Sequence, residues 1–337
     1  MLPESQMEWR NIPFSTATAG RQNTRWYIVD SIEVDHTTRI RDLLRDVRVL
    51  ATKLSQADPL AFGLLNCKGV VPVSRQHAAS SEREYVRFQL VFRIPHGMEV
   101  LQSLRHLLLN SDAYLSLSQK VRIARELTKA VNYVHTFDFV HKNVRPESVL
   151  CFESSEGTPR SHAFLVGFDA FRESGTGTMM GGDTSWDRNV YRHPRRQGVN
   201  PAERYRMQHD IYSLGVCLLE IGLWESFVEY TDENESAGPS QTKVGKSYNR
   251  FQAWLKKKHG SVSTEDLPDR LKDYLVEQAG SLLAPRMGDR YIQVVISCLT
   301  CLDDDNEDFG GEEGLSDDFV AVQFIEKVMK SIDDISV

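Results

Sequence analysis

Two short polar stretches carry most of the side chains that could do chemistry. Residues 141–150 (HKNVRPESVL) offer an imidazole, an amide, a guanidinium and a hydroxyl, and residues 165–169 (LVGFD) end in a carboxylate. Oxygen-bearing side chains can hold Mg²⁺, and a guanidinium can bind a phosphate. These residue types are therefore compatible with a phosphorylated ligand, provided that enough positive charge converges on it.

The remaining pattern predicts the elements that would position these stretches. Aromatic and β-branched runs predict strands over residues 25–34, 62–73, 85–94, 148–152 and 163–168. Apolar residues at helical spacing predict helices over residues 38–54, 117–136, 210–224, 267–283, 291–301 and 319–332. The helix over 210–224 is apolar on nearly all sides, which is typical of a helix at the centre of a helical domain. The chain is thus expected to form a small sheet with one crossing helix, followed by a mostly helical part.

The polar stretches resemble motifs of protein kinases. HKNVRPESVL is similar to the catalytic loop H-R-D-L-K-P-E-N-V-L, and LVGFD lies where a kinase has L-x-D-F-G. Tyr191–Arg195 (YRHPR) lies where the activation segment closes on A-P-E, and His209–Gly215 (HDIYSLG) resembles the start of the kinase central helix. The resemblance covers roughly residues 25–335. The exact residues of these motifs are similar to those of fungal kinase-like domains that accompany HeLo-type cell-death modules.

This resemblance implies an α+β, bilobal protein-kinase-like fold. A reduced, β-rich N-terminal lobe would span residues 25–94, and a larger, mostly α-helical C-terminal lobe would span residues 95–337. Residues 1–24 are expected to be a linker or a degenerate N-terminal segment. No HeLo-like module precedes the kinase-like region, which is compatible with a truncated family member or a fragment.

The N-terminal part lacks the groups with which a kinase binds phosphates. A Gly-rich loop covers the phosphates because only a backbone without Cβ can approach them closely. Gly20 is the only glycine among the first 60 residues, and no lysine precedes Lys53. Asp30 stands where the phosphate-binding lysine is expected, and its charge would repel a polyphosphate. The crossing helix offers no glutamate, although Arg45 or Arg48 could replace the lysine geometrically.

The catalytic loop and the next motif have also lost their reactive groups. Asn143 replaces the base, and an amide cannot accept a proton near neutral pH. Arg145 replaces the loop lysine, Ser148 replaces the metal-binding Asn, and Gly167 replaces the metal-binding Asp. Asp169 lies two positions further on, which is about 7 Å along an extended chain. It is therefore only a weak candidate for a metal or cofactor ligand.

Residues of the scaffold are retained. The resemblance implies that His141 packs under the activation segment, that Phe168 fills the space between the lobes, and that Asp210 binds the catalytic-loop backbone. His141 is equally explained as a buried histidine, and Asp210 as a helix N-cap. Arg290 corresponds to the arginine that pairs with the A-P-E glutamate, but Arg195 replaces that glutamate, so this ion pair cannot form.

Charge and cysteine content exclude several classes of function. The net charge is -7, and residues 303–318 carry nine acids and no base, so the rest of the chain is nearly neutral and unsuited to nucleic acid. We interpret the acidic segment as a solvated loop, or alternatively as a contact for a basic partner. Cys298 and Cys301 have CxxC spacing without a second pair, which favours ordinary helix residues over a metal or redox site. His193 and His209 also lack metal-ligand spacing.

We therefore expect a catalytically inactive kinase-like domain, a pseudokinase, that acts as a protein-interaction and signalling module in fungal self/non-self recognition or cell death. The alternative is an atypical ATP-binding serine/threonine kinase in which Asp169 holds Mg²⁺. No cofactor is expected, and only the alternative requires ATP with Mg²⁺. Partners are expected to be proteins, with no nucleic acid and no membrane segment. The sparse cysteines and the lack of an 18-residue apolar run predict a cytoplasmic protein.

Overall fold

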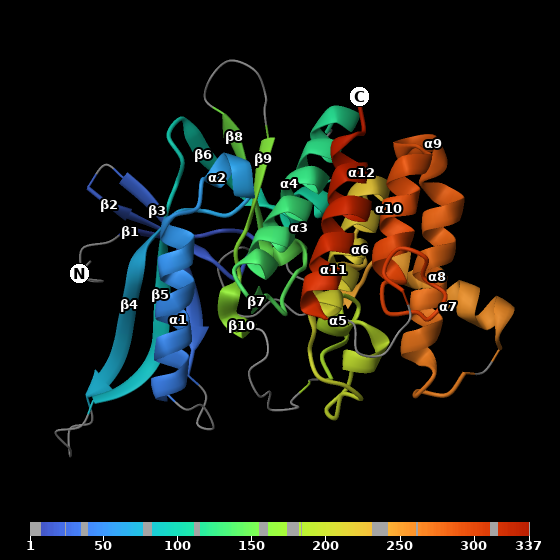
Figure 1. Cartoon of the computed structure of the whole chain (residues 1–337), viewed down its shortest axis with the longest axis horizontal. Helices are drawn as coiled ribbons and strands as arrows, with labels where there is room; N and C mark the ends of the chain where they lie inside the picture. Colours follow the sequence, from blue (N-terminus) through green and yellow to red (C-terminus); the bar gives the residue numbers. More distant parts are fainter. Residues whose placement is uncertain are drawn as a thin grey trace.

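The computed structural model describes most of the chain, and its two ends differ in architecture. The described residues are 8–23, 25–34, 40–76, 83–110, 115–154, 161–173, 182, 184–230, 242–260, 262–310 and 316–336. Figure 1 shows a twisted sheet and one long helix at the N-terminal end and a bundle of helices at the C-terminal end.

The N-terminal sheet has five antiparallel strands in the order β1-β2-β3-β5-β4. Their bounds are β1 Glu8–Asn11, β2 Thr18–Gln22, β3 Arg25–Glu33, β4 Cys67–Gln76 and β5 Arg83–Arg93. Helix α1 (Ile40–Ser55) packs on β4 and β5 through Val47, Leu50 and Leu54, which are spaced by three or four residues. Strands β1 and β2 fall within the segment expected to be a linker or a degenerate end. A linker is therefore wrong for residues 8–11 and 18–22, because their backbone groups are paired within the sheet.

The C-terminal part is built around two buried helices, α4 (Leu117–Thr136) and α6 (Met207–Leu223). Ser116 and Gln119 form a capping box that fixes the start of α4. Every residue of α6 is buried, as its apolar pattern predicts. The other helices are α2 Pro59–Phe62, α3 Leu104–Leu109, α5 Trp186–Asn189, α7 Lys246–Lys258, α8 Leu267–Leu282, α9 Ala284–Met287, α10 Asp289–Leu299, α11 Asp317–Gln323, the π-helical turn η5 Phe324–Met329 and α12 Lys330–Asp333.

Short strands and 3₁₀ turns connect the two parts. Strands β6 Met98–Ser103, β8 Val149–Ser154 and β9 Ser161–Leu165 form a second antiparallel sheet, and the remaining strands pair as β10 Arg172–Glu173 with β7 Phe139–Val140, and β11 Val228–Tyr230 with β12 Thr242–Val244. The 3₁₀ turns are η2 Pro146–Ser148, η3 Phe168–Ala170 and η4 Pro194–Arg196.

One continuous apolar core runs through both parts of the molecule. Between them lie three rings: that of Phe168 is 6.3 Å from Phe92 of β5 and 4.8 Å from His141. The architecture is the α+β, bilobal kinase-like fold predicted from the motifs, with a sheet-rich N-terminal lobe and a helical C-terminal lobe. None of the described helices is both long and apolar enough to cross a bilayer.

Candidate functional site in the cleft between the lobes

Asp30, expected to repel a phosphate, binds the protein's own backbone instead. It lies in β3 and is fully buried, and its Oδ2 accepts the N–H of Gly167 (2.8 Å) and of Phe168 (2.7 Å). Its Oδ1 has no hydrogen-bond partner among the described residues. Burial raises the pKa of Asp30 to about 7, with a further contribution from the negative charge of Asp169, while the two N–H groups oppose the shift. The carboxyl thus ties the N-terminal sheet to the segment where a kinase holds its metal.

The catalytic-loop side chains form a closed set of contacts around Asn143. Its amide Nδ2 donates to Asp169 Oδ1 (2.7 Å) and to Gly167 O (3.2 Å), and its Oδ1 accepts from Arg145 Nε (2.8 Å). The Ser148 hydroxyl is buried and lies 2.7 Å from Asn143 O and 2.8 Å from Arg145 O. The structure therefore brings the predicted positions together, but their polar atoms form hydrogen bonds with one another.

Gly167 cannot easily regain the metal-binding carboxylate. Its φ of +83° lies in the left-handed region, which favours glycine. A Cβ there would lie 2.8 Å from the Ser148 Cβ, and 3.1 Å from both Asn143 Nδ2 and Thr16 Oγ1. Because side chains of the catalytic loop and of the β1–β2 connection fill this space, an Asp at position 167 would require these neighbours to move.

The β1–β2 connection, which covers the phosphates in a kinase, is bound to the C-terminal lobe. Ser15 Oγ donates to Glu147 O (3.1 Å), and Ser103 Oγ donates to Pro13 O (2.6 Å). The Phe14 ring lies 4.6 Å from that of Tyr230. These contacts hold the connection against the C-terminal lobe across the cleft.

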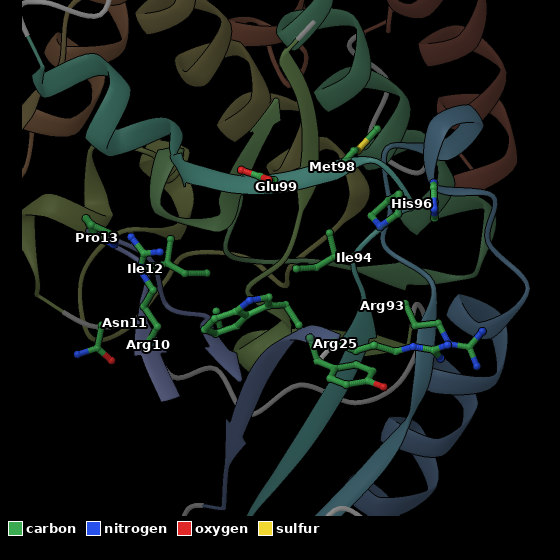
Figure 2. A pocket seen from close by; sticks show the side chains of 14 residues that line it. Arg10, Asn11, Ile12, Pro13, Arg25, Arg93, Ile94, His96, Met98 and Glu99 are labelled. Atoms are coloured by element: carbon green, nitrogen blue, oxygen red, sulfur yellow. The ribbon is translucent and has the colours of Figure 1, made fainter. Parts of the chain in front are cut away.

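Two pockets show what space remains. The larger, of about 670 Å³, lies where the sheet meets β6, and Figure 2 shows Arg10, Arg25 and Arg93 on its walls. That volume suits a small ligand, but none of the catalytic-loop residues lines it. The other pocket touches Asn143 and Arg145 and has about 10 Å³, which is at the lower limit for one water molecule. A ligand in the larger pocket would therefore not meet the catalytic-loop side chains.

Asp210 stabilises the catalytic loop by accepting hydrogen bonds from its backbone. Its carboxylate accepts the backbone N–H of His141 (2.7 Å) and of Lys142 (2.8 Å), the hydroxyl of Tyr205 (2.6 Å) and His135 Nε2 (3.1 Å). Burial alone would raise the pKa of Asp210, but the hydrogen bond and charge of His135 lower it overall. This residue, at the start of α6, therefore fixes the loop conformation.

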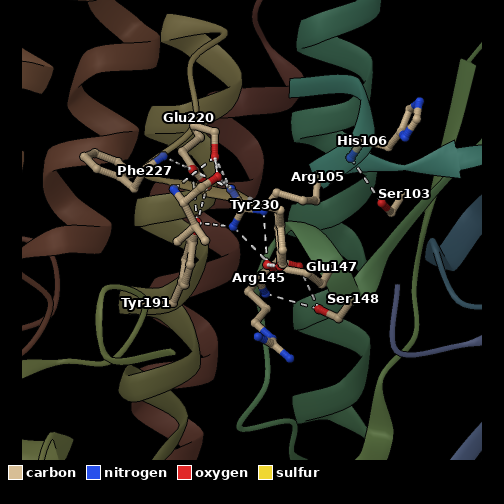
Figure 3. A network of polar contacts seen from close by, with 12 residues as sticks. Ser103, Arg105, His106, Arg145, Glu147, Ser148, Tyr191, Glu220, Phe227 and Tyr230 are labelled. Atoms are coloured by element: carbon tan, nitrogen blue, oxygen red, sulfur yellow. Dashed lines mark hydrogen bonds and ion pairs between the residues drawn. The ribbon is translucent and has the colours of Figure 1, made fainter. Parts of the chain in front are cut away.

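A buried ionic network links α3, η2, α6 and the activation segment (Figure 3). Arg105 of α3 is fully buried and contacts Glu147 (3.1 Å) and Glu220 (3.2 Å). Tyr191 donates to Glu220 (2.9 Å), and Tyr230 donates to Glu147 (2.8 Å). Although burial opposes it, the charge of Arg105 lowers the pKa of Glu147 to about 2, whereas burial raises the pKa of Glu220. The sequence analysis missed this network, although an arginine within the apolar stretch Leu104–Leu109 was a signal for it.

His193, Glu203 and His209 also lie together, although their spacing along the chain gave no indication of this. Their potential ligand atoms are all within 4.8 Å of one another. However, Nδ1 of His209 accepts the Arg206 N–H (2.8 Å), and Nδ1 of His193 accepts the Arg195 N–H (3.3 Å). In neutral rings Nε2 then carries the proton, whereas a ligating histidine usually donates from the nitrogen that does not bind the metal. The arrangement suits hydrogen-bonded neutral histidines better than a metal ion.

The charged residues of α1 and α10 lie away from the cleft. Arg45 pairs with Asp46 (2.9 Å) at the helix surface, and Arg48 is exposed, so neither replaces the missing lysine. Arg290 is half exposed and contacts Asp334 (3.6 Å between Nη1 and Oδ2). Its side chain lies at the end of the C-terminal helix, against which α10 packs.

Comparison with known proteins supports the kinase-like relationship. The chain is 29% identical over 129 residues to a Mycoplasma pneumoniae protein named "Putative serine/threonine-protein kinase", covering 35% of this chain and 33% of the relative. It is 31% identical over 123 residues to a Caenorhabditis elegans protein named "Putative ribosomal protein S6 kinase alpha-2", covering 36% of this chain and 15% of the relative. Over about a third of its length the chain is similar to these two proteins named as kinases. The aligned parts span a third or less of the length of these relatives, and no family model matches the chain.

Proposed function

We propose that this chain is a catalytically inactive kinase-like domain, which works as a protein-interaction and regulatory module. The observation that carries the proposal is the pair of hydrogen bonds from Gly167 and Phe168 to the buried Asp30 carboxyl. A lysine would be needed at this position to bind phosphates. An acid that accepts backbone N–H groups supplies no positive charge at this position and joins the lobes instead.

Three further features support inactivity. Asn143 cannot act as a base, Ser148 is bonded to loop carbonyls, and the space at Gly167 is filled. Asp169, the carboxylate that the alternative function would use to hold a metal, is exposed and hydrogen-bonded to Asn143. Phosphoryl transfer depends on several preorganised charges, and losing each one typically costs several kcal/mol of transition-state stabilisation.

The interaction role has a structural rationale. The buried networks around Asp210 and Arg105 keep the C-terminal lobe and the end of the activation segment ordered without any ligand. An ordered surface of this kind can bind a protein partner. The similarity of the motif strings to fungal kinase-like domains suggests that the partner, or an attached domain, is a cell-death effector in self/non-self recognition. Five buried free cysteines are compatible with the cytoplasm, which we propose as the location.

Two assays test inactivity. In thermal unfolding, a ligand that binds only the folded state raises the melting temperature. We expect no Mg²⁺-dependent shift with ATP and no transfer of radiolabelled phosphate to a protein substrate or to the chain itself. Mg²⁺-dependent stabilisation together with phosphate transfer, both lost in Asp169→Ala, would instead establish an atypical serine/threonine kinase.

A further inference from the structure

The C-terminal helix has two apolar faces, and only one is needed for folding. Helix α11, the π-helical turn η5 and α12 follow one another without a break from Asp317 to Asp333 and pack against α4 and α10. Figure 1 shows this helix lying beside α4. The packed face consists of residues four apart, which are at most 1% exposed: Val320, Phe324, Val328 and Ile332.

The other face carries an exposed apolar stripe formed by Phe319, Val322 and Ile325. Their exposed fractions are 40%, 51% and 46%. Eight large apolar side chains are exposed in the described part of the chain, and three of them fall within these seven residues. Spacing by three residues places them on one side of a helix. Single exposed apolar residues are ordinary, but a contiguous group of this kind marks an interaction surface.

Acidic side chains border this stripe. Asp318 and Glu326 are exposed and adjacent in sequence to Phe319 and Ile325. The acidic loop before the helix is held against it by an ion pair between Asp308 and Lys327 (3.6 Å). Three further acids of that loop are exposed: Asp304, Asp305 and Glu307. Two bases of the same helix, Lys327 and Lys330, are also exposed, and Lys327 is paired with Asp308. The surface therefore combines an apolar centre with a border in which acids outnumber bases.

We propose that the stripe of Phe319, Val322 and Ile325 docks an amphipathic helix of a partner protein that carries lysines or arginines beside its apolar face. Helix-in-groove recognition uses apolar anchors spaced by three or four residues, which is the spacing of the stripe. The acidic border supplies the complementary charge and would speed association.

The same border disfavours two other occupants. In a two-fold dimer an identical patch meets itself, so Asp318 and Glu326 would be brought toward the acids of the second copy. An anionic membrane surface would also repel these carboxylates. A basic helix gains from both the apolar and the charged parts of the surface.

This inference rests on the interaction role proposed above and is tested with synthetic peptides. The probe is a fluorescent 14-residue helix with leucines on one face and lysines on the other. Its two controls are a peptide of the same composition in scrambled order and a leucine/glutamate helix. We expect the leucine/lysine helix to bind at least tenfold more tightly than either control in fluorescence anisotropy.

Variants locate the binding site. Val322→Ser combined with Ile325→Ser should weaken binding about tenfold or more, and Val199→Ser should leave it unchanged, since Val199 is 57% exposed but lies elsewhere. Asp304→Asn with Asp305→Asn should weaken binding only at low salt, because surface charges are screened at high salt. Unchanged circular dichroism and melting temperature of each variant show that the fold is kept.

Several results would overturn the proposal. Equal binding of the scrambled peptide, or binding unaffected by the stripe variants, would show that the stripe recognises no helix. A dimer in analytical ultracentrifugation that Val322→Ser dissociates would assign the stripe to a second copy. Stripe-dependent co-sedimentation with phosphatidylserine vesicles would assign it to a membrane. None of these results bears on phosphate transfer, so failure here is distinguishable from failure of the inactive-kinase proposal.

Discussion

Two buried carboxyl groups, Asp210 and Asp30, differ in how fully the protein satisfies them. Four donors reach Asp210, and its pKa is lowered. Only the N–H groups of Gly167 and Phe168 reach the side chain of Asp30 from other elements, and its pKa is raised to about 7. Burial favours the neutral form at both sites, so the neighbouring groups decide which acid stays ionised: the hydrogen bond and charge of His135 lower the pKa of Asp210, whereas the charge of Asp169 adds to the raised pKa of Asp30.

This difference separates a preserved region from an altered one. The lower lobe keeps buried polar networks around Asp210 and Arg105, and the donors that reach Asp210 include the backbone of the catalytic loop. The contact between the lobes is made by an acid that burial leaves only partly satisfied. The scaffold is thus maintained by strong local networks, while on the function that we propose Asp30 replaces the lysine with which a kinase binds a nucleotide.

The largest expected effect on stability comes from the buried network around Arg105. Arg105→Ala would leave Glu147 and Glu220 buried without their cation. Breaking a buried ion pair in this way typically lowers the free energy of unfolding by about 3–5 kcal/mol. Urea unfolding followed by circular dichroism measures it. Arg250→Ala removes an exposed pair with Glu225 and should change stability by less than about 1 kcal/mol. Equal losses in both variants would contradict the assigned importance of the buried network.

A second effect is the pH dependence that Asp30 contributes. Its folded pKa of about 7 exceeds the ordinary value of 3.8, so between these values the folded state binds a proton that the unfolded state does not. The contribution of Asp30 to stability therefore falls as pH rises from about 4 to 7 and is constant above that range. At about 1.4 kcal/mol per pKa unit, the difference of about 3 between these pKa values corresponds to a full change of roughly 4 kcal/mol.

Asp30→Asn isolates this contribution. His141 and His193 have lowered pKa values because of burial, and they make stability rise with pH over part of the same range. The quantity to measure is therefore the difference in unfolding free energy between wild type and variant. We expect the unfolding free energy of the Asn variant to rise relative to that of wild type from pH 5 to 8, because only wild type loses the contribution of protonated Asp30. The Asn Oδ1 can still accept both N–H groups. A difference that does not change with pH would mean that Asp30 is ionised throughout.

A third effect tests Asp210, the carboxylate that four donors reach. Asp210→Asn would replace one carboxylate oxygen with an NH₂ group that faces donors, lowering the free energy of unfolding by about 2–3 kcal/mol. Hydrogen exchange of the His141 and Lys142 amides should accelerate more than that of amides in β4. Uniform acceleration over the whole chain would show that Asp210 stabilises the fold in general and not the loop in particular.

The sequence predicted the lower lobe better than the cleft. Apolar periodicity placed α4 at its observed bounds, and the apolar run of α6 predicted its burial. These elements depend on local pattern, which a sequence displays directly. Strands β1 and β2 were missed because their short polar segments are stabilised by pairing with β3 and by contacts of Ser15 and Pro13 with the other lobe.

Side-chain roles divide in the same way. Motif positions identified Asn143, Ser148 and Gly167 as altered, but the sequence could not show that their atoms bind one another. Asp30 was interpreted as a source of repulsion because its partners lie about 137 residues away along the chain. A lone acid in the apolar strand Tyr27-Ile28-Val29-Asp30 was nevertheless a signal, since a buried carboxyl group requires donors.

The smallest effect, and the sharpest test of the cleft, comes from restoring the missing acid in Gly167→Asp. The left-handed backbone and the close Ser148 Cβ should lower the free energy of unfolding by about 1–3 kcal/mol in both this variant and Gly167→Ala. The Asp side chain is also larger than that of Ala, but only its charge makes the difference in stability between the two variants depend on pH. A second carboxylate beside Asp30 would raise the pKa of Asp30 further, so the stability of the Asp variant should fall below that of the Ala variant as pH rises from 5 to 8.

Neither variant should gain Mg²⁺-dependent stabilisation by ATP, because Asn143 and Ser148 remain bonded to neighbouring groups. Gain of such stabilisation in the Asp variant alone would show that a single residue keeps this cleft from binding a nucleotide.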